Sequence, residues 1–150
     1  LHQSRLGAAL EAVGAEPMAR LEAYIDVHLA TGASADPNAM ATWVMLSGEA
    51  LRNEAVRVAY SNALMGNAGV LRRIVDDGVE SGAFKCSDPA VSTAALTALI
   101  QGYYEVAATA RSLIPRGSAA TAARLACVGL LGMTMRGPAS PPQLEDGDTA

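Results

Sequence analysis

Aromatic residues are scarce in this chain. They make up only 4% of its 150 residues, whereas hydrophobic residues as a whole make up 51%. The core must therefore be built mainly from aliphatic side chains and alanine. Such a core suits helix packing better than a β-sandwich, whose pleated faces favour β-branched and aromatic side chains. Alternating apolar patterns and hairpin signals are also lacking. We therefore predict an all-α fold in a single domain.

Basic residues are few and scattered. The formal net charge is −4, and Arg72 and Arg73 are the only adjacent basic pair. Because binding to phosphates requires clustered Lys and Arg, this pattern argues against nucleic-acid binding by the chain itself. Long apolar runs are missing too, since a charged residue, glutamine or glycine interrupts each one. We therefore expect no membrane span.

Cysteine and histidine occur only twice each. Cys86 and Cys127 lack metal-site spacing, which favours free thiols in a reducing cytoplasm, with a disulfide as the alternative. Asp26 and His28 fall on different sides of a helix and make a poor metal site, so we expect His28 to face a pocket or solvent. Glu-x-x-His pairs, phosphate-binding glycine loops and an identifiable serine triad are lacking. We therefore expect no metal, no cofactor and no enzymatic activity.

Proline and capping residues mark the starts of several helices. Pro17, Pro37 and Pro89 each follow an acidic residue, which suits the first turn of a helix. Asn53 is expected to cap a long helix that ends at Gly82. Apolar periodicity predicts about six helices. They cover residues 1–13, 17 to the stop at Gly32, 37–51, 53–81, 90–113 and 119–135.

The last two of these segments carry rows of small residues. A row of Ala and Gly at helical spacing leaves a shallow groove in which the backbone of another helix can come close. We therefore predict that the two helices form a four-helix seam between two copies of the chain, which makes a homodimer. The predicted interface residues are Ala94, Ala98, Gly102, Ala122, Ala126 and Gly129.

Larger and more polar side chains interrupt these small-residue helices. Apolar walls with a few hydroxyl and amide groups are typical of small-molecule pockets, although any one of these side chains could simply fill a core. A cationic ligand could stack on Trp43 or Tyr103, with Glu105 nearby. The predicted ligand-binding residues are Met40, Trp43, Ser47, Tyr60, Asn67 and Tyr103.

Several short segments occur in a characteristic order. They are residues 20–26, Asp36-Pro37 leading to Trp43, residues 49–52, Val56-Arg57 with Tyr60, residues 77–84, and residues 95–103. On these segments, the chain resembles the C-terminal domain of TetR-type transcriptional regulators from about residue 16 to 132. The resemblance is strongest to the branch of betaine-pathway, choline-sensing repressors. It implies an all-helical effector-binding domain that dimerises through its last two helices.

The resemblance also implies a domain organisation. Residues 1–136 would form the effector-binding and dimerisation domain of a cytoplasmic repressor. Residues 1–14 would be the remnant of the helix that leads to a missing N-terminal helix-turn-helix domain, through which alone the parent protein would bind DNA. Residues 137–150, with three prolines and three acidic residues, are expected to form a disordered tail. The alternative is a free-standing helical adaptor without a small ligand.

Overall fold

The computed structural model describes residues 2–29, 37–115 and 117–133, and the predicted acidic tail lies outside them. Within these ranges the chain is helical and contains no strand, which confirms the predicted all-α fold. The helices are α1 (His2–Val13), α2 (Pro17–Leu29), α3 (Pro37–Glu49), α4 (Glu54–Glu80), α5 (Pro89–Thr109) and α6 (Ser118–Leu131), with a short 3₁₀ turn η1 (Arg111–Leu113).

Side-chain caps fix the starts of three helices. The carboxylate of Glu16 accepts hydrogen bonds from two backbone amides in the first turn of α2, at 3.0 and 2.6 Å. Asn53 caps α4 through the amide of Val56 at 3.3 Å. Asp88 caps α5 through two amides at 2.9 and 3.0 Å. These caps satisfy amides that have no partner within their own helix, and they confirm the predicted starts.

The ends of the last two helices differ from the prediction. α5 stops at Thr109 rather than at residue 113, because Ala110 leaves helical geometry and η1 follows. Ile114 is extended, as residues before proline tend to be. α6 ends at Leu131 because Gly132 adopts a left-handed conformation with φ 58°. The amide of Lys85 donates to the carbonyl of Leu131 at 2.7 Å and so satisfies one of the last carbonyls of the helix.

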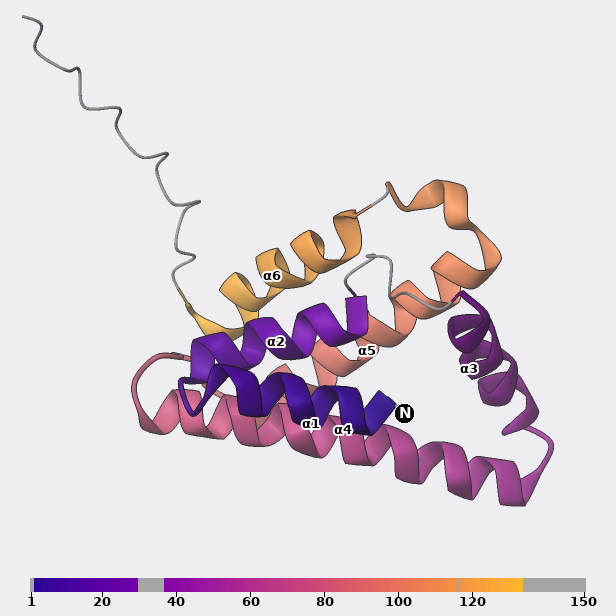
Figure 1. The fold of residues 1–150 in the computed structure, drawn as a ribbon, viewed down its shortest axis with the longest axis horizontal. Coiled ribbons are helices and arrows are strands. Elements are labelled where there is room, and N and C mark those ends of the chain that lie inside the picture. Colours follow the sequence, from indigo (N-terminus) through magenta and orange to yellow (C-terminus); the bar gives the residue numbers. More distant parts are fainter. Residues whose placement is uncertain (1, 30–36, 116, 134–150) are drawn as a thin grey trace, which may run out of the picture.

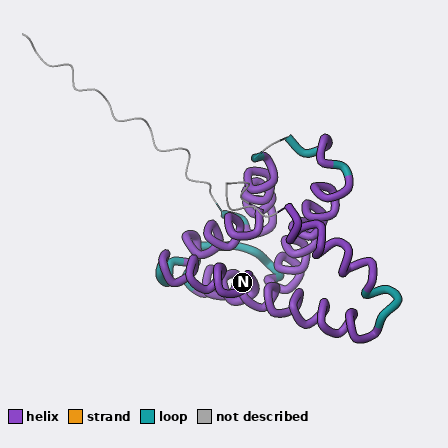
Figure 2. The backbone as a smooth tube through the Cα atoms, turned by 45° about the vertical axis from the view of Figure 1, so that its right-hand side comes forward, coloured by secondary structure: helices purple, strands orange, loops and turns teal. Residues whose placement is uncertain are grey.

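Helix α5 occupies the centre of the arrangement, in contact with α2, α3, α4 and α6 (Figure 1). α1 packs on α2, and α2 lies along the second half of α4. α3 stands apart from them and bridges the first half of α4 to α5. Figure 2 shows from another side that the described chain consists of helices joined by loops. None of the helices in the described ranges combines the length and the apolarity that crossing a bilayer requires.

The hydrophobic core lies at one end of this arrangement. It is formed by α1, α2, the second half of α4, the connector before α5, and the inner faces of α5 and α6. Its largest fully buried side chains are Leu21, Tyr24, Leu71, Ile74, Val75, Phe84, Cys127 and Leu131. No buried core residue of the described chain comes from α3 or from the first half of α4. Space for a cavity therefore remains where these two segments meet α5.

Candidate functional site

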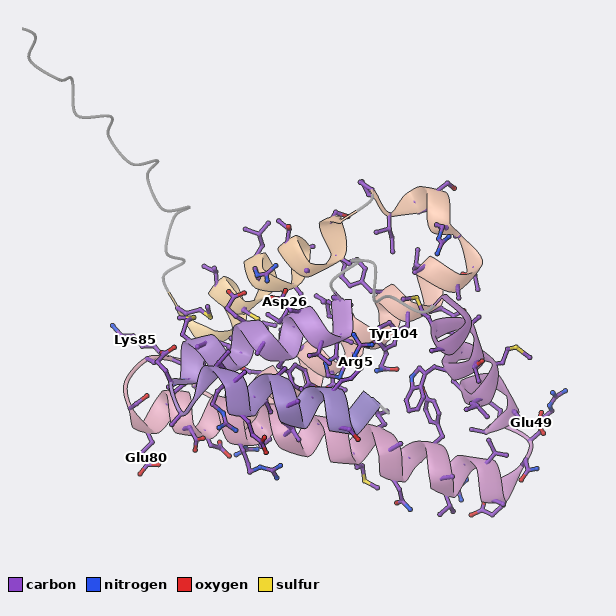
Figure 3. All side chains as sticks on the ribbon, viewed as in Figure 1. Arg5, Asp26, Glu49, Glu80, Lys85 and Tyr104 are labelled. Carbon is purple, nitrogen blue, oxygen red and sulfur yellow. The ribbon has the colours of Figure 1, made fainter. Side chains whose placement is uncertain are left out.

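A cavity of about 270 Å³ lies between α3, α4 and α5. Each of the three helices contributes side chains, so the shape of the cavity depends on how α3 is held against the other two. Figure 3 shows Tyr104 in the interior of the molecule, whereas Glu49 and Glu80 lie at its edges. The lining residues are Trp43, Val44, Ser47, Tyr60, Gln101, Gly102, Tyr104 and Glu105.

An aromatic pair and an amide connect the three helices around this cavity. The rings of Trp43 and Tyr60 lie 4.5 Å apart between centroids, tilted by 32°. The indole Nε1–H of Trp43 donates to the side-chain oxygen of Gln101 at 2.6 Å, and the hydroxyl of Tyr60 donates to the same oxygen at 3.4 Å. Gln101 on α5 therefore accepts one hydrogen bond from α3 and one from α4. These hydrogen bonds hold the side chains of the cavity wall in place, at a part of the molecule where no deep apolar core supports them.

The hydroxyl groups of the wall remain protonated at neutral pH. Burial raises the pKa of Tyr60 above its ordinary value. Hydrogen bonds with Trp43 and Ser47 oppose this shift, and the negative charge of Glu105 adds a smaller increase. Burial also raises the pKa of Tyr104, with a smaller effect from Tyr24 on α2. Ser47 donates its hydroxyl hydrogen to the carbonyl of Val44 at 2.7 Å. Glu105, which is exposed, is the only acidic or basic residue among those that line the cavity.

Three of the six predicted ligand-binding residues line the cavity: Trp43, Ser47 and Tyr60. The other three do not. Met40 is half-buried on α3, and Tyr103 packs against the hydrophobic core. Asn67 lies further along α4, where its backbone carbonyl accepts the hydroxyl of Tyr24 at 3.1 Å.

The sequence interpretation placed Glu105 near a possible ligand but left out Gln101 and Tyr104, which also line the cavity. Tyr104 and Glu105 follow Gln101 by three and four residues, so both lie next to Gln101 on one helix surface. Tyr104, and not the predicted Tyr103, is the tyrosine of α5 that lines the cavity. Helical spacing from Gln101 was the signal that distinguishes the two tyrosines.

The predicted interface residues lie on the outer sides of α5 and α6. Ala94, Ala98, Gly102 and Gly129 are exposed, whereas Ala122 and Ala126 are half-buried. Val91 and Leu125 are 62% and 63% exposed on the same outer stripes, spaced three or four residues from their small neighbours. The opposite sides of the two helices face each other, and the hydroxyl of Ser92 donates to the carbonyl of Leu130 at 3.0 Å. The dimer itself stays a prediction.

The surroundings of His28 and of the two cysteines are those of residues that stabilise the fold. His28 is buried, and its ring stacks on Tyr24 at 4.2 Å, so it does not face solvent, which was one of its two expected surroundings. Its Nδ1 lies 2.8 Å from the carbonyl of Tyr24. Cys86 and Cys127 are free thiols, and burial raises the pKa of Cys127 to about 12. Within the described ranges, no three His, Cys, Asp or Glu residues are grouped as metal ligands would be.

Fold and cavity together define an all-helical domain with a small aromatic cavity beside its central helix. A family model described as the C-terminal domain of BetI-type transcriptional repressors matches residues 17–132. The chain therefore belongs to this family of TetR-type C-terminal domains, which confirms the resemblance seen in the sequence. This is a family of regulatory domains and not an enzyme family. Searches of curated proteins and of solved structures returned no match.

Proposed function

We propose that this chain is the small-molecule-sensing and dimerisation domain of a TetR-type repressor. The observation that carries the proposal is the cavity between α3, α4 and α5, in a chain that belongs to the family of repressor C-terminal domains. Its volume is close to the lower end of the range for ligand pockets, and its wall combines aromatic faces with a few oriented polar groups. A small effector molecule is therefore the expected occupant.

Dimerisation would use the outer stripes of α5 and α6. Exposed Ala94, Ala98 and Gly129 allow two helix backbones to approach closely, and exposed Val91 and Leu125 would become buried in the seam. A two-fold arrangement presents the same stripes from both copies, so one self-complementary face is sufficient. Gly102 belongs both to this stripe and to the wall of the cavity, which places the two functions on adjacent surfaces of α5.

The effect of ligand binding would be transmitted to α1 through Tyr104 and α2. Tyr104 lines the cavity and also packs against the hydrophobic core, close enough to Tyr24 for their hydroxyls to interact electrostatically. Tyr24 belongs to α2, on which α1 packs. In the parent regulator, a shift of α1 would alter the spacing of two DNA-reading heads that must match half-sites about one helical turn apart. A coupling of roughly 1–3 kcal/mol is typical of such a link.

Thermal unfolding in the presence of small amines, carboxylic acids and apolar compounds tests the sensing function. A ligand present at a hundredfold its Kd stabilises the folded chain by about 2.7 kcal/mol and raises the unfolding temperature. The Trp43→Ala variant should lose this response, because Trp43 forms a ring contact and a hydrogen bond in the wall.

Leu51→Ala is the matched control, since Leu51 is 87% exposed outside the cavity. This variant should respond as the wild type does. A panel in which no compound stabilises the wild type would contradict the sensing function. Equal stabilisation of the wild type and Trp43→Ala would place the binding site elsewhere.

A further inference from the structure

Helix α3 is attached to the rest of the described chain by few contacts. It packs on α5 and on the first half of α4, and it contributes no buried residue to the described hydrophobic core (Figure 1). On its outer side, Met45 and Leu46 remain 74% and 40% exposed. Because buried apolar contacts are what protect an element from local opening, α3 belongs to the least stable part of the fold.

The sequence of α3 also gives the helix little stability of its own. It has 13 residues, and helices shorter than about 12–15 residues are marginal in water. Thr42, Ser47 and Gly48 have a lower helix propensity than Ala or Leu, and that of Gly48 is the lowest. Glu49, its last residue, is the only charged one, so no ion pair can form within the helix. We therefore expect α3 to lose its helical structure when it leaves its neighbours.

The polar contacts that hold α3 come from the cavity wall. Among the side chains described on α3, which are those of residues 39–49, Trp43 donates to Gln101 at 2.6 Å and its ring contacts that of Tyr60. Ser47 forms a hydrogen bond with the hydroxyl of Tyr60. All four of these residues line the cavity. The contacts that keep α3 in place are therefore the contacts that complete the cavity wall.

The two neighbours of α3 are held independently of it. α4 begins with its own cap at Asn53, and its second half enters the core with Leu71 and Ile74. α5 is anchored in the same core through Leu96 and Ile100. Detachment of α3 would therefore leave the other two walls of the cavity in place.

We propose that α3 is a lid, which reversibly detaches from α4 and α5 and loses its helical structure while the core stays folded. Three of the eight lining side chains belong to α3, namely Trp43, Val44 and Ser47, so its detachment opens the cavity to solvent. The inference goes beyond the proposed function, because it assigns the route into the cavity and does not depend on which ligand binds there. A ligand that contacts all three helices would shift the population toward the closed lid.

Hydrogen exchange of the backbone amides, measured on the wild-type chain without ligand, tests this opening directly. We expect the amides of α3 to be protected at least roughly tenfold less than those of α2 and of the second half of α4, each compared with an unstructured chain. Equal protection of α3 and the core helices would overturn the inference, because α3 would then open only when the whole chain unfolds.

Two substitutions should change the opening of α3 in opposite directions. Gln101→Met removes the acceptor of Trp43 at similar side-chain length, and should speed exchange in α3 by roughly two- to tenfold. Gly48→Ala adds a Cβ that meets nothing within 4 Å and favours the helix, so it should slow exchange in α3 by roughly two- to fivefold.

Each substitution has a matched control outside α3. Ser92→Ala removes a hydrogen bond that joins α5 to α6 instead of α3, and Gly7→Ala adds a Cβ to α1 that also meets nothing within 4 Å. Both controls should leave exchange in α3 at its wild-type rate. If exchange in α3 changes together with that of the core in any of the four variants, α3 does not open alone and the inference is overturned. The thermal-unfolding panel then still decides the sensing function separately.

Discussion

At the scale of single residues, Gly78 and Phe84 show how closely the core is packed. A Cβ at Gly78 would come within 2.0 Å of the ring of Phe84, a distance that no real contact allows. The ring therefore lies directly on the backbone of α4, and the amide of Phe84 donates to the carbonyl of Gly78 at 2.9 Å. This contact fixes the connector between α4 and α5.

Gly78→Ala should therefore destabilise the chain by about 1–3 kcal/mol, because the overpacked ring must move. Chemical unfolding measures this free energy. Gly69→Ala is the matched control on the same helix, where the added Cβ meets only the end of Arg73 at 3.9 Å. That variant should gain up to about 1 kcal/mol, since alanine favours helices over glycine. Equal effects of the two substitutions would contradict the packing described here.

At the scale of helices, an arginine joins α6 to α2. The guanidinium of Arg124 donates to Glu22 and to Asp26, each at 2.5 Å. Arg124 and Glu22 are partly shielded from solvent, whereas Asp26 is exposed. Burial by itself would lower the pKa of Arg124, but the hydrogen bonds with the two carboxylates outweigh it and raise the pKa. These two ion pairs hold α6, one of the helices of the predicted dimer seam, against α2, on which α1 packs.

Arg124→Met keeps the aliphatic stem and removes the charge, leaving two carboxylates one helical turn apart. We expect a loss of about 1–2 kcal/mol in the free energy of unfolding, reduced by added salt. In Arg57→Met, the exposed pair with Glu54 is lost, and the expected cost is at most about 0.5 kcal/mol. Chemical unfolding at low and high salt compares the two, and a larger cost for Arg57→Met would contradict this account.

The starts of the helices could be predicted from the sequence, but two of the ends were predicted wrongly. Asn53 and Asp88 act on amides two or three residues away, so their effect is visible in the local sequence. Gly132, at which α6 ends, is a local stop signal that the prediction passed over, and the amide of Lys85 that satisfies the Leu131 carbonyl lies far away in the chain. The break after Thr109 has no comparable local signal.

The residues that line the cavity were predictable only in part, because some of their contacts join positions that lie far apart in the sequence. Trp43 and Tyr60 stand out because large aromatic side chains are rare in this chain. Gln101 does not stand out, since its role depends on a hydrogen bond with a residue 58 positions away. Only the packing of α3 against α5 brings these two residues together.

At the scale of the whole molecule, one end of the described chain holds the hydrophobic core and the other end holds the cavity. Helix α5 belongs to both ends. The core anchors α5 through Leu96 and Ile100, and the cavity begins at Gln101, the next residue along the helix. The exposed stripe of α5, formed by Val91, Ala94, Ala98 and Gly102, runs beside both the core and the cavity. A second copy seated on this stripe would therefore touch the wall of the cavity at Gly102, which joins ligand binding to dimerisation.

The mass of the chain in solution, measured by light scattering, tests this central claim most directly. The account predicts a mass twice the 15.4 kDa of one chain for the wild type. In Ala98→Glu, a charge in the seam should shift the mass to that of one chain, because a buried unpaired carboxylate opposes association. Ala55→Glu, on the exposed side of α4, should remain a dimer. A wild-type chain with the mass of a single copy, or an Ala98→Glu variant that stays a full dimer, would contradict the account.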